Sequence, residues 1–351
     1  MTQPRTNLMT RLLRAGHVLT RRILSPFRKP PKVRMLYLEV THRCNARCIA
    51  CYTKAGKEKP DVLTLEEKKS VIAQAKALGA KTVSLSGSGE PLLYEPLFDL
   101  IDYIRRLEMQ VVIFTNGTVL DEHAARRLLA DDVITYFKLY SLDPNVFDRM
   151  MGRTNAYTWV PYAYSYEGTT RHATIPSGLK ALLDAQNGTN TTGLVRVETL
   201  ITRLNAGTVG EVARLCRELG LVLHLETPVF TGRAIENYAE IALGPEEYGS
   251  LYRELVAVLG DQYFRELRAH PCPVERNPVV WTNGDIGFCS SRPAKIGNVR
   301  EASLESLFLK AYRAKRQEDR RVAARLDRGR YFRTCPARQH FEMKHQLPCD
   351  Y

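Results

Sequence analysis

The sequence alternates short runs of β-branched and aromatic residues with longer segments of helical periodicity, and this alternation restricts the fold most. Alternating strand and helix patterns are typical of parallel α/β structures. One helix is marked by a capping box at Thr64-Leu-Glu-Glu67 and by Gly79 at its end. We therefore predict an α/β fold with a partial (β/α)6 TIM-like barrel. The predicted strands are 34–40, 82–86, 111–115, 134–141, 194–201 and 221–226.

Composition limits the compartment and the chemistry. The chain has 351 residues, 44% of them hydrophobic, and no apolar run of the roughly 18 residues that a membrane-spanning helix needs. The first thirty residues lack the apolar core and small-residue cleavage site of a signal peptide. We therefore expect a cytoplasmic protein, in which the eight cysteines stay reduced and are available for metals or catalysis.

The net charge of +13 is concentrated at the N-terminus, where residues 1–34 hold nine Lys or Arg and no acid. We predict a basic extension over residues 1–32 that is solvated and packs on the body. Apolar residues at near-helical spacing leave a second interpretation open, an amphipathic helix that contacts an anionic membrane surface or an acidic partner. The rest of the chain has a net charge of +4, which is ordinary for its length, and no nucleic-acid partner is expected.

Three cysteines directly follow the first predicted strand, in the order Cys44-x3-Cys48-x2-Cys51. Three thiolates can bind three irons of a 4Fe-4S cubane and leave the fourth iron open to a chelating small molecule. Two other sites use similar ligands: a zinc knuckle, which His42 can complete, and a ferredoxin-type cluster, which needs a fourth cysteine. The position of the motif at the exit of the first strand of a βα series favours the open cubane.

This arrangement resembles the radical S-adenosylmethionine (SAM) superfamily, and the resemblance extends from residue 33 to about residue 240. It implies that the open iron binds SAM and that an electron cleaves SAM to a 5′-deoxyadenosyl radical, which takes a hydrogen atom from substrate. Many members of the family have an aromatic residue before the third cysteine, near the adenine. This chain has Ala50 and Tyr52 around Cys51, so we predict that these two residues serve the adenine.

The segments after the next strands also resemble SAM-binding positions of the family. Gly87-Ser88-Gly89-Glu90 corresponds to its Gly-Gly-Glu-Pro segment, where glycines admit a ligand and oxygens receive the ammonium of SAM. Asn116, Ser141 and Arg153 follow the third and fourth strands, and a guanidinium suits the carboxylate of SAM. Taken alone, such residues are also typical of turns and helix caps.

Two acidic residues lie on otherwise apolar predicted strands, Glu198 on the fifth and Glu226 on the sixth. A carboxylate there must be paired or face a polar cavity, because burying it alone is costly. We predict that they bind substrate or accept its proton, and ion pairs with Arg196 or Arg203 are an equally good interpretation. Cys216 lies in a predicted helix and is expected to be a packing residue.

The C-terminal region holds a second set of cysteines. Cys272 and Cys289 lie in a C-x11-G-x4-C spacing that resembles the start of SPASM and twitch domains, the auxiliary-cluster modules of radical SAM enzymes. The segment between them predicts a hairpin that turns at Asn283-Gly284. With Cys335 and Cys349 these cysteines are predicted to hold one auxiliary 4Fe-4S cluster, and tetrahedral zinc is the alternative.

The predicted organisation has four parts: the basic extension, a radical SAM barrel over residues 33–240, a helical linker over residues 241–270, and a small C-terminal α+β iron–sulfur domain over residues 271–351. Residues 152–177 are rich in tyrosine and interrupt the βα series. We predict that they form a long loop or lid, a feature that is often functional in compact domains.

Our functional prediction is a radical SAM oxidoreductase that abstracts hydrogen from a sugar, aminocyclitol or nucleoside-like small molecule and passes an electron to the auxiliary cluster. A flavodoxin or ferredoxin is the expected electron donor. The small molecule is favoured because residues 1–32 are too short for a peptide-recognition domain. Two alternatives stay open: a maturase that modifies a ribosomally made peptide and, in another class, a non-catalytic iron–sulfur or zinc protein that binds a partner.

Overall fold

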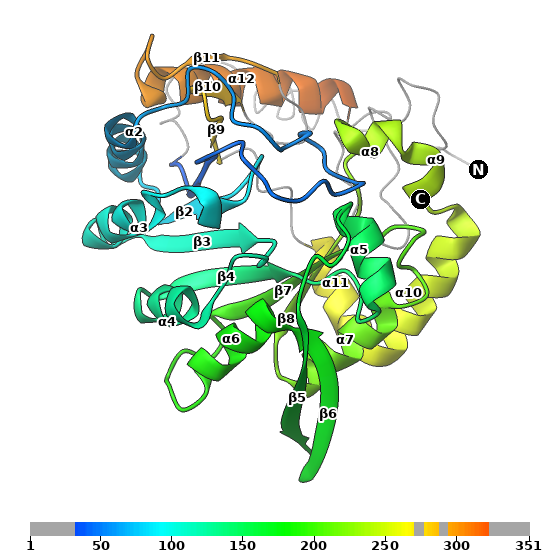
Figure 1. The fold of residues 1–351 in the computed structure, drawn as a ribbon. Helices are drawn as coiled ribbons and strands as arrows, with labels where there is room; N and C mark the ends of the chain where they lie inside the picture. Colours follow the sequence, from blue (N-terminus) through cyan, green and yellow to red (C-terminus); the bar gives the residue numbers. More distant parts are fainter. Residues whose placement is uncertain (1–31, 270–276, 288–293, 323–351) are drawn as a thin grey trace, which may run out of the picture. The chain divides into compact units, whose positions relative to one another are not determined.

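The computed structural model describes residues 32–269, 277–287 and 294–322. Its centre is a nine-stranded sheet in the order β11-β10-β9-β1-β2-β3-β4-β7-β8 (Figure 1). Strands β1 to β4, β7 and β8 are parallel, and each matches a predicted strand, which confirms the α/β fold with a partial barrel. Their bounds are Met35–Leu38 (β1), Thr82–Leu85 (β2), Gln110–Thr115 (β3), Val133–Lys138 (β4), Val195–Leu200 (β7) and Val222–Glu226 (β8).

Helices connect these strands, and each buries part of its surface in the core. In α3 (Leu97–Arg106) this part is the apolar stripe of Leu97, Leu100, Ile101 and Ile104, which follows the helical period and is fully buried. The predicted capping box is confirmed at α2, where Thr64 and Glu67 exchange hydrogen bonds. The other crossover helices are α2 (Leu65–Ala77), α4 (Glu122–Ala130), α5 (Pro144–Met151), α6 (Ser177–Gln186) and α7 (Val209–Glu218), and a short 3-10 helix η2 (Pro91–Leu93) follows β2.

Residues 152–177 differ from the prediction of a long loop. Most of this segment is an antiparallel hairpin of β5 (Trp159–Tyr166) and β6 (Thr169–Pro176), which extends away from the sheet (Figure 1). The tyrosines alternate with small residues at the period of two that a strand requires, and Glu167-Gly168 turns with positive φ at both positions. The loop prediction was wrong because it relied on polarity and overlooked this alternation.

The chain after β8 is helical and then returns to the sheet. The predicted helical linker contains α10 (Pro245–Leu259) and α11 (Asp261–Ala269), which are separated by Gly260 with a φ of +80°. The predicted hairpin around Asn283-Gly284 is confirmed: β9 and β10 pair antiparallel and Gly284 has a φ of +83°. The remaining elements are α8 (Arg233–Glu236), α9 (Tyr238–Ile241), β9 (Val279–Val280), β10 (Asp285–Gly287), β11 (Gly297–Asn298) and α12 (Leu304–Val322).

Strand β9 pairs in parallel with β1, so the described part of the C-terminal region continues the barrel sheet. The four predicted auxiliary-cluster ligands Cys272, Cys289, Cys335 and Cys349 lie outside the described residues, as does nearly all of the basic extension. Within the described ranges, no helix has both the length and the apolar character needed to cross a membrane.

Candidate active site

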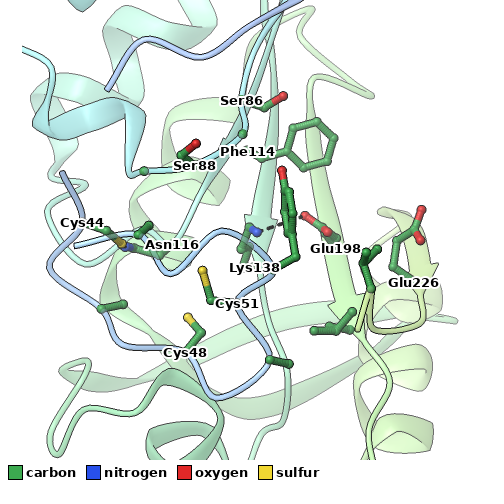
Figure 2. Close-up of a pocket in the computed structure, with 18 of the residues that line it drawn as sticks. Cys44, Cys48, Cys51, Ser86, Ser88, Phe114, Asn116, Lys138, Glu198 and Glu226 are labelled. Atoms are coloured by element: carbon green, nitrogen blue, oxygen red, sulfur yellow. Dashed lines mark hydrogen bonds and ion pairs between the residues drawn. The ribbon is translucent and has the colours of Figure 1, made fainter. Parts of the chain in front are cut away.

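A cavity of about 330 Å³ lies at the C-terminal ends of the parallel strands, beside the cysteine loop, residues 41–56. Catalytic residues gather at this end of TIM-type barrels, because the loops that follow the strands converge there. Figure 2 shows polar side chains from several strands directed into one space. The polar lining outside the cysteine loop is Glu39, Ser86, Ser88, Glu90, Asn116, Lys138, Glu198, His224, Glu226, Thr227 and Arg233.

The three motif cysteines lie together on the cysteine loop and line this cavity (Figure 2). Cys44, Cys48 and Cys51 are partly exposed free thiols, whereas Cys216, the other cysteine in the described part of the chain, is buried in α7. No group of three or more His, Cys, Asp or Glu converges to hold a single metal ion among the described residues. A cubane takes one thiolate per iron and so spreads its ligands, and three thiols on one loop fit it.

Neighbouring elements fix the backbone of the cysteine loop. The N–H groups of Arg47 and Ile49 donate to carbonyls at the end of α5, at 2.9 and 3.1 Å. From the other side, the N–H of Glu90 donates to the carbonyl of Arg43 at 2.9 Å. Gly89 allows this approach, because a Cβ there would lie 2.5 Å from two carbonyl oxygens of the loop. The glycine of the predicted SAM segment therefore also sets the position of the cysteines.

The thiols differ in how readily they ionise. Burial raises the pKa of Cys48 to about 12 and also raises the pKa of Cys44. Burial opposes ionisation of Cys51 as well, but hydrogen bonds from the side chain and backbone of Thr53 outweigh it and lower the pKa of Cys51. Thiolates are the form that binds iron, so Cys51 is the cysteine whose surroundings most favour the ligating state.

Most of the residues predicted to bind SAM line the cavity: Ala50, Tyr52, Gly87, Ser88, Gly89, Glu90 and Asn116. Glu90 is buried, and its carboxylate accepts hydrogen bonds from the hydroxyl of Thr115 at 2.6 Å and from the N–H of Asn116 at 2.7 Å. The amide of Asn116 donates to the side chain of Asn45 at 3.1 Å. Glu90 and Asn116 thus connect the ends of β2 and β3 to the cysteine loop.

Two predicted SAM-binding residues do not line the cavity. Ser141 is fully buried; its hydroxyl donates to Thr208 at 2.9 Å and accepts from the N–H of Asp143 at 3.0 Å. Ser141 therefore stabilises the turn before α5, whose N-cap is Asp143. Arg153 is exposed and donates to the carbonyl of Asn45 at 3.3 Å. The cations that line the cavity are instead Lys138 and Arg233.

Lys138 at the end of β4 and Glu198 on β7 form an ion pair across 3.8 Å inside the cavity (Figure 2). Burial opposes the charge on Lys138, but the negative charges of Glu198 and of a Cys48 thiolate outweigh it and raise its pKa. The suggested arginine partners are wrong for Glu198, because Arg196 donates to Tyr136 and Arg203 pairs with Glu247. Lys138 was not predicted, although a lysine on an otherwise apolar strand is a signal that the sequence contains.

Glu226 on β8 forms a hydrogen bond of 2.8 Å with His224, two residues earlier on the same face of the strand. Burial lowers the basicity of His224, but the bond and the charge of Glu226 outweigh it and raise its pKa. Both residues line the cavity, so its β8 wall presents an imidazole and a carboxylate that can exchange a proton. Glu226 faces a polar cavity, as predicted. His224 was not predicted as a cavity residue.

Glu39 is an acid at the cavity that was not predicted from the sequence. It follows β1, is 1% exposed, and lines the cavity. Its Oε2 accepts a hydrogen bond from the hydroxyl of Ser88, and its Oε1 has no partner among the described residues. Gly87 leaves room for it, since a Cβ at Gly87 would lie 2.3 Å from the Glu39 side chain. The sequence pattern that indicated Glu198, an acid on or after an apolar strand, also applies to Glu39.

Burial raises the pKa of Glu39 from 4.5 to about 7, which makes a testable prediction about stability. When a carboxyl group has a higher pKa in the folded state, the free energy of unfolding of the protein falls as pH rises from about 4.5 through about 7, by roughly 3 kcal/mol in total. The Glu39→Gln variant keeps the shape without this titration. We therefore expect urea unfolding of the metal-free variant to show greater stability than wild type at pH 8 and equal stability at pH 4.5. A difference that does not depend on pH would contradict this assignment.

Comparisons with known proteins agree with this site. Residues 38–160 match the model of the radical SAM superfamily, and this range includes the three cysteines, the Gly87–Glu90 segment and Lys138. The mycofactocin maturase MftC of Mycolicibacterium smegmatis is 24% identical over 232 residues, which are 64% of this chain and 54% of that protein. This chain thus spans about half the length of that curated relative.

Two further proteins are similar over longer stretches. An AdoMet-dependent heme synthase of Oleidesulfovibrio alaskensis is 26% identical over 284 residues, 74% of this chain and 67% of that protein. The crystal structure of Streptococcus suis SuiB bound to S-adenosylmethionine has a TM-score of 0.61 and 15% identity to this chain. The matched region covers 90% of this chain and 75% of the SuiB chain. At that identity the likeness concerns the fold. Residues 38–160, which carry the cysteines at the cavity, are therefore similar to radical SAM domains in sequence.

Proposed function

We propose that this protein is a radical SAM enzyme that modifies a peptide. The observation that carries the enzymatic part is the cavity in which three thiols meet a buried carboxyl group and a lysine at the C-terminal ends of the strands. Cys44, Cys48 and Cys51 would hold a 4Fe-4S cluster and leave one iron for SAM. When bound, this cluster supplies the electron that cleaves SAM to the 5′-deoxyadenosyl radical, which takes a hydrogen atom from the substrate.

The lining residues suggest how SAM would be oriented. Lys138 offers a cation for its carboxylate, while the oxygens of Ser88 and Glu39, from the β1–β2 part of the lining, suit its ammonium. Ala50 and Tyr52 flank the third cysteine and remain the candidates for the adenine. In this arrangement Lys138 takes the role that the sequence analysis assigned to Arg153, because Arg153 lies on the protein surface.

Replacing Lys138 tests this orientation. We expect Lys138→Gln to weaken SAM binding to the reconstituted enzyme by roughly 10- to 100-fold, since hydrogen bonds between charged groups contribute about 1.5–3 kcal/mol. Lys138→Arg should recover part of the affinity because it keeps the charge. Lys69→Gln is the matched control, since Lys69 pairs with Glu66 on the surface of α2. Equal dissociation constants for Lys138→Gln and the control, measured by equilibrium dialysis, would rule out this role.

The peptide substrate rests on the relatives. MftC is named a maturase of mycofactocin, and SuiB has been crystallised with its precursor peptide SuiA, at a TM-score of 0.57 to this chain. These similarities favour a peptide over the sugar, aminocyclitol or nucleoside-like substrate that the sequence analysis preferred. The named heme synthase is the observation that keeps a non-peptide substrate as a second candidate. Oxidation through an auxiliary cluster and a flavodoxin or ferredoxin donor remain predictions.

The two substrate classes can be separated with one assay. Reconstituted enzyme, SAM and dithionite are incubated either with short peptides encoded beside its gene or with coproporphyrin-type compounds, and the products are analysed by mass spectrometry. A peptide substrate should raise 5′-deoxyadenosine formation above the rate without substrate and should change mass by the loss of hydrogen or the formation of a cross-link. A response to the tetrapyrrole alone would replace the peptide proposal with the second candidate.

A further inference from the structure

The segment after β8 holds the cysteine loop through its backbone carbonyls. We call residues 231–237, which include α8, the clamp segment. Gly232 within it has a φ of +58°, and a Cβ there would lie 2.5 Å from the carbonyl oxygen of Tyr52, so the two backbones pack directly. The clamp donates five sets of hydrogen bonds: Arg233 Nε to Cys48 O (3.0 Å), Asn237 Nδ2 to Ile49 O (3.0 Å), Arg233 N to Cys51 O (2.8 Å), Thr231 Oγ1 to Tyr52 O (2.9 Å), and Arg233 Nη1 and Nη2 to Ala55 O (3.1 and 3.2 Å).

This contact closes the open side of the barrel. Strands β8 and β11 are the two edges of the described sheet, so the sheet itself does not connect β8 to the β1 side. The clamp bridges this gap at the cavity end, where Figure 1 shows the chain after β1 approaching α8. A small apolar cluster supports it, in which Ala50 of the cysteine loop packs with Phe230 and Ala234. The β8 wall with His224 and Glu226 is thereby tied to the cysteines.

Arg233 also brings a charge to this position. Its guanidinium donates to neutral carbonyl oxygens and, in the described part of the chain, forms no ion pair with a carboxylate. Its Nε lies 3.0 Å from the carbonyl oxygen of Cys48, and its backbone N–H lies 2.8 Å from the carbonyl oxygen of Cys51, so the cation is held beside two of the cysteines. Reduction of an iron–sulfur cluster adds one negative charge, and nearby charge and hydrogen bonding set its reduction potential. A fixed cation beside the cysteines therefore favours the reduced state.

We propose that Arg233 is a positioning residue that fixes the cysteine loop and raises the reduction potential of the cluster bound there. The part about the potential rests on the proposed function, whereas the part about the loop concerns the metal-free protein. Two effects are thus separable: the planar guanidinium bonds two carbonyls of the loop at once, which lysine cannot reproduce, and the positive charge is shared by both residues.

The test compares four variants in two measurements. Arg233→Gln removes the charge and the fork of donors, Arg233→Lys keeps only the charge, and Asn237→Ala removes one uncharged donor. Arg126→Gln is the matched control, because Arg126 forms an exposed ion pair with Glu122 on α4 and its replacement removes the same charge. The first measurement is hydrogen exchange of metal-free protein over residues 44–56. The second is the midpoint potential of the reconstituted cluster, followed by electron paramagnetic resonance.

We expect exchange in the loop to be about tenfold faster in both Arg233 variants than in the control, and less affected in Asn237→Ala. The midpoint potential should become more negative in Arg233→Gln and stay near wild type in Arg233→Lys. Unchanged exchange in Arg233→Gln would overturn the positioning role, and a potential equal to that of the control would overturn the electrostatic role. Failure of the wild type to assemble a cluster would instead refute the proposed function, while the exchange result would still decide the role of the clamp.

Discussion

Replacing Cys44, Cys48 and Cys51 together with alanine is expected to abolish formation of 5′-deoxyadenosine from SAM, to below detection. Without these thiolates no iron at the cavity has a protein ligand, so the electron that cleaves SAM cannot be delivered. The fold should survive, because all three side chains are partly exposed at the cavity and lie outside the secondary-structure elements. The measurement is chromatography with mass detection after reconstitution and reduction, together with iron analysis of each protein.

Cys216→Ala is the matched control for this variant. Cys216 is 1% exposed within α7, and burial raises the pKa of its thiol to about 12, so it is an inert packing residue. The control should lose some stability and keep SAM cleavage. If the triple variant still cleaved SAM, the assignment of the cluster ligands would be wrong. If the control lost activity at normal stability, Cys216 would have a chemical role that its burial does not suggest.

Gly89→Ala is expected to lower SAM cleavage by about 100-fold while the protein stays folded. The added Cβ would lie 2.5 Å from the carbonyl oxygens of Thr41 and Arg43, and backbone atoms cannot turn away as a flexible side chain can. The cysteine loop must therefore shift, and displacements of about 1 Å near reacting groups can cost about 100-fold in rate. Overpacking of this kind also destabilises a protein, by about 1–3 kcal/mol.

Gly207→Ala is the control for this substitution. No heavy atom lies within 4 Å of a Cβ at Gly207, and the residue does not have a positive φ, so we expect nearly wild-type activity and stability. Activity is measured as the initial rate of 5′-deoxyadenosine formation, and stability by urea unfolding. A Gly89→Ala enzyme as active as the control would contradict the close contact between the Gly87–Glu90 segment and the cysteine loop.

Much of the fold followed from the sequence because local and long-range signals agree. The six parallel strands are buried apolar runs separated by amphipathic helices, and each was found within a few residues. The Asn283-Gly284 turn was found for a similar reason, since its chemistry specifies a hairpin. The β5–β6 hairpin was missed because its tyrosines and threonines lie in a polar, exposed segment, where alternation is easily mistaken for the composition of a loop.

The candidate site was predicted where a motif carried it and missed where only position did. The cysteines and the Gly87–Glu90 segment form local patterns, and the structure brings them to one cavity. Glu39, Lys138 and His224 are single polar residues on, or directly after, separate strands, and their meeting depends on how the whole sheet brings these strand ends together. Ser141 was placed on the correct strand end, but which way its side chain points cannot be read from a motif.

Iron content tests the prediction about the C-terminal cysteines, which lie outside the described residues. A second cubane there predicts about eight irons per chain after reconstitution, whereas zinc at those cysteines predicts about four irons and one zinc. The triple variant should then keep about four irons in the first case and none in the second. These values follow from counting clusters, so metal analysis of the two proteins distinguishes the two cases.

The most direct test of the central claim is SAM cleavage by the wild-type protein. Anaerobically reconstituted protein is reduced with dithionite in the presence of SAM, and 5′-deoxyadenosine and methionine are quantified over time. A radical SAM enzyme should form both products in equal amounts, with a cluster signal that changes when SAM is added. A protein that assembles a 4Fe-4S cluster, yet forms no 5′-deoxyadenosine with or without candidate substrates, would contradict the account.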